Sequence, residues 1–540
     1  TRACARTAAE AAAGGEGEEG EEEAPLALSR SRRVRTPTRI AAAAAAQSGG
    51  RAARPRATGG MHCAHPMGEW RLCARYQRPL IAELEAAVTA ARRRLGPSAP
   101  PPPANPPRSD QSHQSPPRLP PNASLRAFQE AWRRGAPLLL AGVGDKLRRD
   151  LWTPAALAKL HGSLGVKLVA LSDAAGADVE FDATVGDFFE GYDPARRSAA
   201  RRKLQRSGGI ELGSAARLLK LKDFPPAADF AELLPKQHAD WAAAIPFAAY
   251  TSRTGQLNLA SALPHWSLPP DLGPKMYAAY GCIEETEPLD HDGDGAAAEV
   301  AAGAGAVGSC PGSTKLHMDM SDAVNVLVHV APSRGGGGSG SGGGGGSAHA
   351  VASCRDEVSG GEGDWLSRQR GTGAIGAVWD IWAAEDEPRL SAFLARVASE
   401  RGEAPAHPIH DQCFYVGRAL RERLAAEEGV RGWRFVQRQG EAVFIPAGCP
   451  HQVLNVRACI KVAQDFVSPE HLPRCLSLLD AFRPLPRAHK RSEDLLGPKA
   501  IAAHAASRAL HALGAHFLHQ PPHESQPPQR QAPPPRPPPN

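Results

Sequence analysis

The sequence predicts an α+β or mainly β fold, with disordered segments at both ends of the chain. Helical patterns alternate with short apolar runs from about residue 122 onward. Tracts rich in proline, glycine or alanine flank and interrupt this part of the chain. The 540 residues give room for one large domain or two ordinary ones, plus tails. The formal net charge of +6 is too small to indicate direct DNA binding.

Residues 1–60 are expected to be disordered. They hold the acidic run EGEEGEEE, the basic run SRSRRVR and an alanine run, and such a segment cannot bury enough apolar surface to fold. The basic run is typical either of a nuclear import signal or of a solvated tail. The chain begins with Thr1, so Met61 is a plausible alternative start. No signal-peptide core and no apolar run of roughly 18–20 residues is found, so we expect no membrane association.

Residues 61–96 are expected to form a short helical segment that includes the remnant of a zinc finger. Cys63, His65 and Cys73 are candidate ligands, but three ligands do not complete a tetrahedral zinc site. The ten cysteines include no CxxC pair, which indicates reduced, intracellular thiols. Residues 97–121 then read as a proline-rich linker.

The main folded domain is expected to span residues 122–500. Its first helix is predicted in SLRAFQEAWRRG, capped by Ser124, and a buried strand follows in APLLLAGV. Strand and helix patterns continue from there. Residues 292–308 and 333–363 read as flexible surface insertions, which cost little because loop-closure entropy grows slowly with length. Residues 501–540 are expected to hold the end of a helix and a proline-rich disordered tail.

The segment KLHMDMSDAVNVLVHV places two polar residues in an apolar strand pattern. In a strand, His317 and Asp319 share one face, roughly 7 Å apart along the backbone. A buried, unpaired carboxylate costs several kcal/mol, so it needs a partner. That partner is either a local hydrogen bond or arginine, or a metal ion.

A second segment of the sequence favours the metal ion over the local partner. EAVFIPAGCPHQV predicts strand, turn and strand, and carries His451, with Lys461 ten residues further on. Two histidines and one carboxylate form the facial triad of non-haem Fe(II) oxygenases. Three positions on the metal then stay open for a 2-oxoacid and O2. In this interpretation Lys461 pairs with the far carboxylate of 2-oxoglutarate, and the Thr314 hydroxyl donates a hydrogen bond to the same group. Taken singly, Lys461 could equally be a surface lysine and Thr314 a turn residue.

The sequence resembles the jumonji-C (JmjC) histone demethylases, in particular the jumonji-domain-1 group, lysine demethylase subfamily 3. The resemblance covers roughly residues 122–500 without the insertions. It is carried by segments such as LRAFQEAWRRGAPLLLAGV, DLGPKMYAAYG, TKLHMDMSDAVNVLVHV, HPIHDQCFYV, IPAGCPHQV and KVAQDFVSPEH. It implies a double-stranded β-helix, a cupin-like jelly-roll barrel with its core at about 250–470, flanked by helices.

The resemblance also implies a function. Fe(II) would be held by His317, Asp319 and His451, and 2-oxoglutarate and O2 would be consumed. The implied reaction is oxidative removal of methyl groups from mono- and dimethylated lysine nine of histone H3. Chromatin and transcription-regulatory complexes would be the partners, and the nucleus the location.

Two cosubstrate assignments stay open in the sequence. Many JmjC enzymes carry the 2-oxoglutarate lysine on the strand after HxD, but residues 323–333 hold no lysine and Arg334 begins the glycine insertion. Lys461 is therefore preferred. Asn325, on that same strand, either faces the cosubstrate or makes a structural hydrogen bond.

Three rival functions share parts of this pattern. A JmjC hydroxylase acting on a non-histone protein would use the same metal residues. A chromatin-binding scaffold without turnover would have no need of the intact triad. A cupin with another metal and a sugar-like substrate would not explain the long matches upstream of the barrel.

Overall fold

The computed structural model describes residues 78–96, 115–171, 178–193, 195–208, 218–225, 229–282, 313–332, 357, 366, 369 and 371–514. The chain divides into two compact units, Thr1–Ala86 and Ala87–Asn540. Helix α3 (Arg78–Leu95) matches the helix expected within residues 61–96. Residues 1–60, the three zinc-ligand candidates, Arg334, the insertion 292–308 and nearly all of 333–363 lie outside the described residues.

The second unit is built on two sheets. The larger has the strand order β1-β2-β11-β8-β13-β6-β5-β3-β4, and the smaller has the order β10-β9-β12-β7. All neighbouring strands are antiparallel except β1 and β2. The strands are β1 Arg118–Leu119, β2 Leu138–Leu140, β3 Gly165–Ala170, β4 Val179–Thr184, β5 Leu219–Phe224, β6 Lys275–Ala279, β7 Thr314–His317, β8 Asp322–Val330, β9 Ile375–Ile381, β10 Trp433–Arg438, β11 Ala442–Ile445, β12 His451–Asn455 and β13 Cys459–Phe466.

The two sheets enclose a common interior. One buried cluster contains Ala323 and Val443 from the larger sheet together with Trp379, Phe435 and Val453 from the smaller. Side chains alternate between the faces of a strand, so every second residue of β8, β11 and β13 faces this interior. The two sheets form the jelly-roll barrel that the resemblance implies, and strands from well before residue 250 extend its larger sheet.

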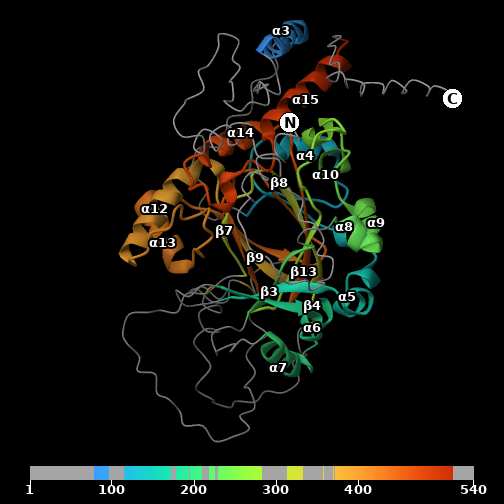
Figure 1. Cartoon of the computed structure of the whole chain (residues 1–540), viewed down its shortest axis with the longest axis vertical. Helices are drawn as coiled ribbons and strands as arrows, with labels where there is room; N and C mark the ends of the chain where they lie inside the picture. The colour runs from blue at the N-terminus through green and yellow to red at the C-terminus, as the bar shows by residue number, and fades with distance from the viewer. Residues whose placement is uncertain are drawn as a thin grey trace, which may run out of the picture. The chain divides into compact units, whose positions relative to one another are not determined.

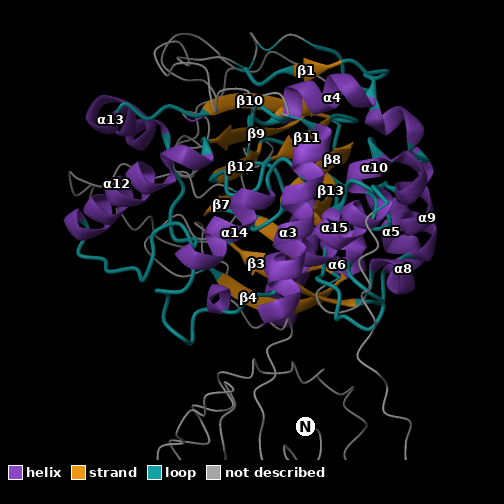
Figure 2. Ribbon diagram, turned by 90° about the horizontal axis from the view of Figure 1, so that it is seen from above, coloured by secondary structure: helices purple, strands orange, loops and turns teal. Residues whose placement is uncertain are grey.

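Helices cover the outer faces of the barrel. In Figures 1 and 2, α12 and α13 lie on one side of the strands, and α5, α8 and α9 lie on the other. None of the helices in the described part of the chain is both long and apolar enough to cross a membrane. The helices of this unit are α4 Leu125–Trp132, α5 Pro154–His161, α6 Val185–Glu190, α7 Arg197–Gly208, α8 Phe230–Leu233, α9 Pro235–Ala244, α10 Ala248–Thr251, α12 Glu387–Glu400, α13 Arg418–Glu428, α14 Leu472–Ala481 and α15 Pro498–Ala512.

Helix α4 forms where its sequence predicts it. The Ser124 side chain accepts a hydrogen bond from the amide of Ala127 at 3.2 Å, which caps the first turn. Phe128 and Trp132 are one turn apart and completely buried. The Phe128 ring lies 5.0 Å from that of Phe444, and such a pair contributes about 0.5–1.5 kcal/mol beyond area burial. These contacts fix α4 against the outer face of the larger sheet.

Candidate metal centre

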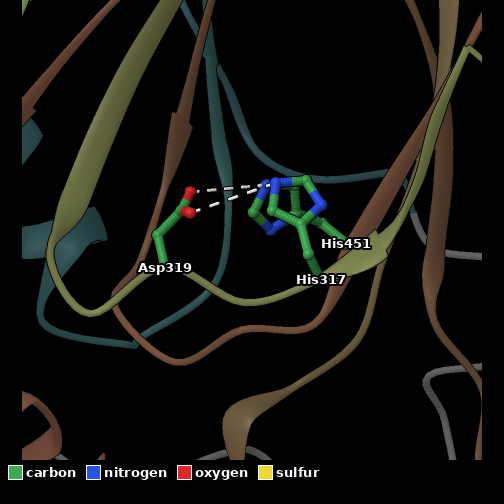
Figure 3. A group of neighbouring side chains, drawn as sticks. All are labelled: His317, Asp319 and His451. Atoms are coloured by element: carbon green, nitrogen blue, oxygen red, sulfur yellow. Dashed lines mark ion pairs between the residues drawn. The ribbon is translucent and has the colours of Figure 1, made fainter. Parts of the chain in front are cut away.

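His317, Asp319 and His451 lie together at one end of the barrel (Figure 3). His317 is the last residue of β7, His451 is the first of β12, and the two are register partners. Their ring centroids are 4.2 Å apart. A carboxylate oxygen of Asp319 lies 3.9 Å from Nε2 of His317, and the other lies 3.5 Å from Nε2 of His451. One ligand atom from each residue fits within a 4.8 Å span, close enough to bind one ion.

Backbone carbonyls orient both imidazole rings. Nδ1 of His317 donates to the carbonyl of Lys315 at 2.9 Å, and Nδ1 of His451 donates to the carbonyl of Cys449 at 3.0 Å. A neutral imidazole whose Nδ1 carries the proton has its free lone pair on Nε2. Both Nε2 lone pairs therefore face the carboxylate of Asp319. Such an outer hydrogen bond is the usual way in which a protein fixes the tautomer of a metal-binding histidine.

The charges of the three groups suit a divalent cation. Burial and the neighbouring His451 lower the pKa of His317 to about 3, so this ring is neutral at physiological pH. Burial opposes ionisation of Asp319, but the nearby His451, His317 and Arg491 hold the pKa of its carboxyl below the usual value. Neutral imidazole nitrogen and an ionised carboxylate are the donors that Fe(II) takes in a facial triad. The residues present therefore fit iron.

Asp319 lies outside a regular strand, contrary to the strand geometry expected from the sequence. Strand β7 ends at His317, and β8 begins at Asp322 in the other sheet. The chain turns between the two sheets at residues 318–321, so strand periodicity does not govern Asp319. In this turn the Oδ1 atom of Asp319 lies 3.9 Å from Nε2 of His317.

A bulge decides where Thr314 lies. In a regular strand, residues 314 and 317 would face opposite ways. Here Thr314 pairs with Val453, whereas His317 pairs with His451, so β7 has one extra residue between the two pairs. A bulge of this kind redirects side chains. Thr314 is therefore placed beside Val453, which belongs to the cluster inside the barrel.

Lys461 is buried in the barrel interior. Its Nζ donates to Oδ1 of Asn455 at 2.5 Å and lies 5.7 Å from the ring centroid of Trp379. Among the residues that the structure describes, no carboxylate forms an ion pair with it, and burial lowers its pKa. A buried ammonium with only an amide partner retains donor capacity for an anion. This environment fits the far carboxylate of 2-oxoglutarate.

Asn325 has an unpaired side-chain oxygen inside the same barrel. The residue lies on β8 between Val443 and Ala463 and is 8% exposed. Its Oδ1 has no hydrogen-bond partner among the described residues. An unpaired buried acceptor is uncommon, and inside the barrel that holds the candidate metal ligands it is open to a bound group. Asn325 is therefore available to a bound cosubstrate.

The sequence interpretation missed three polar residues of the interior. Asn455 holds Lys461, while Asp465 and Tyr277 lie near Asp319. Burial, followed by the Asp319 charge, raises the pKa of the Asp465 carboxyl well above its usual range. Tyr277 is 38% exposed on β6, and burial and the surrounding carboxylates raise the pKa of its phenol. Counting by two along β13 from Lys461 leads to Asp465, so the strand period could have found that residue.

Trp379 and Trp382 lie on opposite faces of the smaller sheet, one inside the barrel and one outside it. Trp379 forms part of the interior wall, with its ring centroid 6.1 Å from that of His451 and its Nε1 donating to Gln437 at 2.8 Å. Trp382 packs in the outer cluster with residues of α12 and α13.

Comparison with known proteins identifies the family. A family model described as "JmjC domain, hydroxylase" matches residues 372–466, which include His451 and Lys461. The chain is 39% identical over 405 residues to lysine-specific demethylase 3A of Rattus norvegicus, covering 73% of this chain and 29% of that protein. It is 38% identical over 384 residues to lysine-specific demethylase 3 of Drosophila melanogaster, covering 70% and 40% respectively. It is 34% identical over 416 residues to lysine-specific demethylase JMJ26 of Arabidopsis thaliana, covering 72% and 42%.

The chain therefore spans less than half the length of each of these relatives. The similarity to these relatives nevertheless extends over more than two thirds of the present chain, and the matched family model includes His451, one of the three candidate ligands. The chain belongs to the JmjC-domain family, in its lysine-specific demethylase 3 group.

Proposed function

We propose that this chain is an Fe(II)- and 2-oxoglutarate-dependent demethylase that removes methyl groups from mono- and dimethylated lysine nine of histone H3. The observation that carries the proposal is the group His317, Asp319 and His451 at the mouth of a barrel that also buries Lys461. 2-Oxoglutarate has two ends to bind. Its 2-oxo carboxylate end would bind the metal, and its far carboxylate would pair with the buried ammonium of Lys461.

Each residue has a distinct task in this proposal. The triad holds Fe(II) on one face and leaves three positions open. Lys461 binds the far carboxylate of 2-oxoglutarate, assisted by the Thr314 hydroxyl, and Asn325 contacts the cosubstrate. With iron, 2-oxoglutarate and O2 bound, the site supplies the oxidising power to hydroxylate an N-methyl carbon, which then leaves as formaldehyde.

A cationic substrate side chain suits the surroundings of the triad. Tyr277 is 38% exposed, and burial of its phenol oxygen, followed by nearby carboxylates that include Asp223 and Asp319, raises its pKa. A methylated ammonium is attracted both by an aromatic face and by carboxylates. These features support methyl-lysine over a neutral side chain. The preference for lysine nine and the nuclear, chromatin-bound location rest on the family resemblance.

The deciding experiment is mass spectrometry of mono-, di- and trimethylated H3 tail peptides incubated with Fe(II), 2-oxoglutarate and ascorbate. Loss of one or two methylene masses from the lysine-nine peptides alone, absent in His317→Ala, is the expected result. Unchanged peptides combined with slow succinate formation would reject the histone substrate but retain the iron centre.

A JmjC hydroxylase acting on a non-histone protein is the second candidate. The matched family model carries the word hydroxylase in its description, and the same triad would serve. Gain of one oxygen mass without formaldehyde release would favour this function. A barrel without any turnover would instead release neither succinate nor formaldehyde.

A further inference from the structure

Asp322, three residues after the candidate ligand Asp319, is a completely buried carboxylate that the proposed reaction does not use. It accepts three hydrogen bonds from two separate segments of the chain. The amide of Ala447 donates at 2.9 Å, the amide of Ser468 at 3.0 Å, and Nδ1 of His471 at 2.6 Å. Its two oxygens thus accept from two backbone amides and one ring nitrogen. We call these four residues the Asp322 clamp.

One arm of the clamp holds the turn that leads to His451. Ala447 lies in the segment between β11 and β12, immediately before Gly448. Gly448 has a φ of +74°, a conformation that favours glycine, and its amide donates to the backbone carbonyl of Asp319 at 3.0 Å. The turn before one histidine is thus tied to the turn that carries the carboxylate ligand.

The other arms anchor the clamp to the outer shell of the barrel. Ser468 and His471 follow β13, and the Ser468 hydroxyl accepts from Nε1 of Trp132 at 3.2 Å. The Trp132 ring lies 4.7 Å from the ring of His471. Helix α4 and the segment after β13 therefore enclose the carboxylate on the side away from the barrel interior.

We propose that Asp322 is a positioning residue that sets the spacing between the two arms of the metal centre. This inference rests on the proposed function, since it takes the triad as the metal site. Ala447 and Asp319 lie in two separate turns, each of which joins a strand of the smaller sheet to a strand of the larger sheet. A rigid acceptor between them fixes the distance at which the His451 and Asp319 ligand atoms meet. Outer partners of metal ligands typically change metal affinity by about 10–100-fold when mutated.

The chain offers a matched control in Asp240. Its carboxylate likewise accepts from a backbone amide, that of Arg148, and from a ring N–H, that of Trp152 at 2.7 Å. It lies in α9, outside the barrel. Replacing either aspartate with asparagine keeps the volume but removes an acceptor. Asp240 is half-buried whereas Asp322 is fully buried, so Asp240→Asn tests whether loss of a partly buried aspartate acceptor outside the barrel is enough to weaken metal binding.

The test titrates the metal-free 540-residue chain with Co²⁺ and follows visible absorption, for the unmodified protein, Asp322→Asn and Asp240→Asn. We expect the Co²⁺ dissociation constant to rise about 10–100-fold in Asp322→Asn and to stay unchanged in Asp240→Asn. Amide hydrogen exchange at Ala447 and Ser468 should accelerate only in Asp322→Asn. Equal dissociation constants in all three proteins, or an equal rise in both variants, would overturn the clamp.

Two further measurements keep the outcome decisive. If Asp322→Asn does not fold, His471→Gln removes one donor and should still raise the Co²⁺ dissociation constant; an unchanged constant overturns the proposal. If the unmodified chain binds no Co²⁺, the proposed metal site fails, and exchange alone then decides. Faster exchange at Ala447 and Ser468 in Asp322→Asn supports the clamp, and unchanged exchange overturns it.

Discussion

Two buried polar regions lie on opposite sides of the same small sheet, and they differ in how completely they are paired. On the outer side, Asp380 accepts from Arg434 at 2.6 and 2.7 Å and from Gln452 at 3.1 Å. On the inner side, Lys461 has an amide as its partner, and Asn325 has an unpaired oxygen among the described residues.

The difference separates a structural region from a binding region. Burying a charge without a partner costs several kcal/mol, so native proteins pair such groups almost everywhere. The outer network is complete in itself and therefore stabilises a conformation. The inner groups remain incomplete, and this points to partners that come from outside the chain. The following predictions test this division, from the largest expected effect to the smallest.

Removing a candidate metal ligand should have the largest effect on function. His317→Ala or Asp319→Ala should abolish Fe(II) binding and turnover, a loss well beyond the roughly 100-fold typical of outer partners. The fold should be largely retained, because the inner region is not self-paired. Metal titration and succinate formation measure the first effect, and thermal unfolding measures the second. Full activity in either variant would contradict the triad.

Breaking the outer network should lower the stability of the fold and leave metal binding unchanged. Asp380→Ala removes the carboxylate that lies 2.6 Å from the buried Arg434 and leaves that of Glu357 at 3.9 Å, and loss of one partner of a buried pair costs about 3–5 kcal/mol. Urea unfolding should show this decrease in the free energy of unfolding. The folded fraction of the variant should bind Co²⁺ at the triad with an unchanged dissociation constant. A stability change below about 1 kcal/mol would show that this network is not structural.

Lys461→Ala should weaken 2-oxoglutarate binding without lowering the free energy of unfolding. Loss of a charge-assisted pair worth about 1.5–3 kcal/mol should raise the 2-oxoglutarate requirement by about one to two orders of magnitude. The free energy of unfolding should not fall, because the chain loses a poorly paired buried charge. Lys167→Ala, at an exposed ion pair on β3, is the control. An unchanged requirement would point to Arg334.

Acid should weaken the protein through buried histidine rather than through the outer network. Burial, together with His407, Arg491 and His489, lowers the pKa of His410 to about 3, below its ordinary 6.5. The neutral ring is therefore favoured in the folded state, and its contribution is full above pH 6.5 and lost as pH falls toward 3.

Between pH 6.5 and 5, the contribution of His410 to the free energy of unfolding should therefore fall by up to about 2 kcal/mol. Asp380 adds nothing in this window, because its arginine partners outweigh burial and hold its pKa below 3.8. Urea titrations at several pH values measure the slope, and His410→Asn should make it less steep without abolishing it, because His317 and His329 also have lowered pKa values. An equally steep slope in the variant would assign the effect to other groups.

Deleting residues 333–350 should have the smallest effect. The segment follows the last residues of β8 and reads as a passive insertion, and closing a shorter loop changes the entropy only slightly. Turnover should remain nearly unchanged in a succinate assay. Collapse of activity would mean that these residues contribute to the inner region.

Local patterns in the sequence anticipated much of this molecule. Ser124 caps its predicted helix, and the strand, turn and strand around His451 form β11 and β12. Such elements depend on residues a few positions apart, so a single stretch of sequence contains the information. The order and spacing of the HxD motif, the distal His451 and Lys461 along the predicted strands indicated that these residues belong to one site, and the barrel brings them together.

Other features depended on contacts between distant segments. The turn between the sheets, and not a strand, sets the position of Asp319, and the bulge in β7 places Thr314. The Asp322 clamp joins residues separated by 125 and 146 positions. By itself, the sequence determined the elements and the chemical identity of the candidate ligands. Only the tertiary structure decided which buried groups were already paired and which still lacked a partner, because pairing is a property of distances across the barrel and not of spacing along the chain.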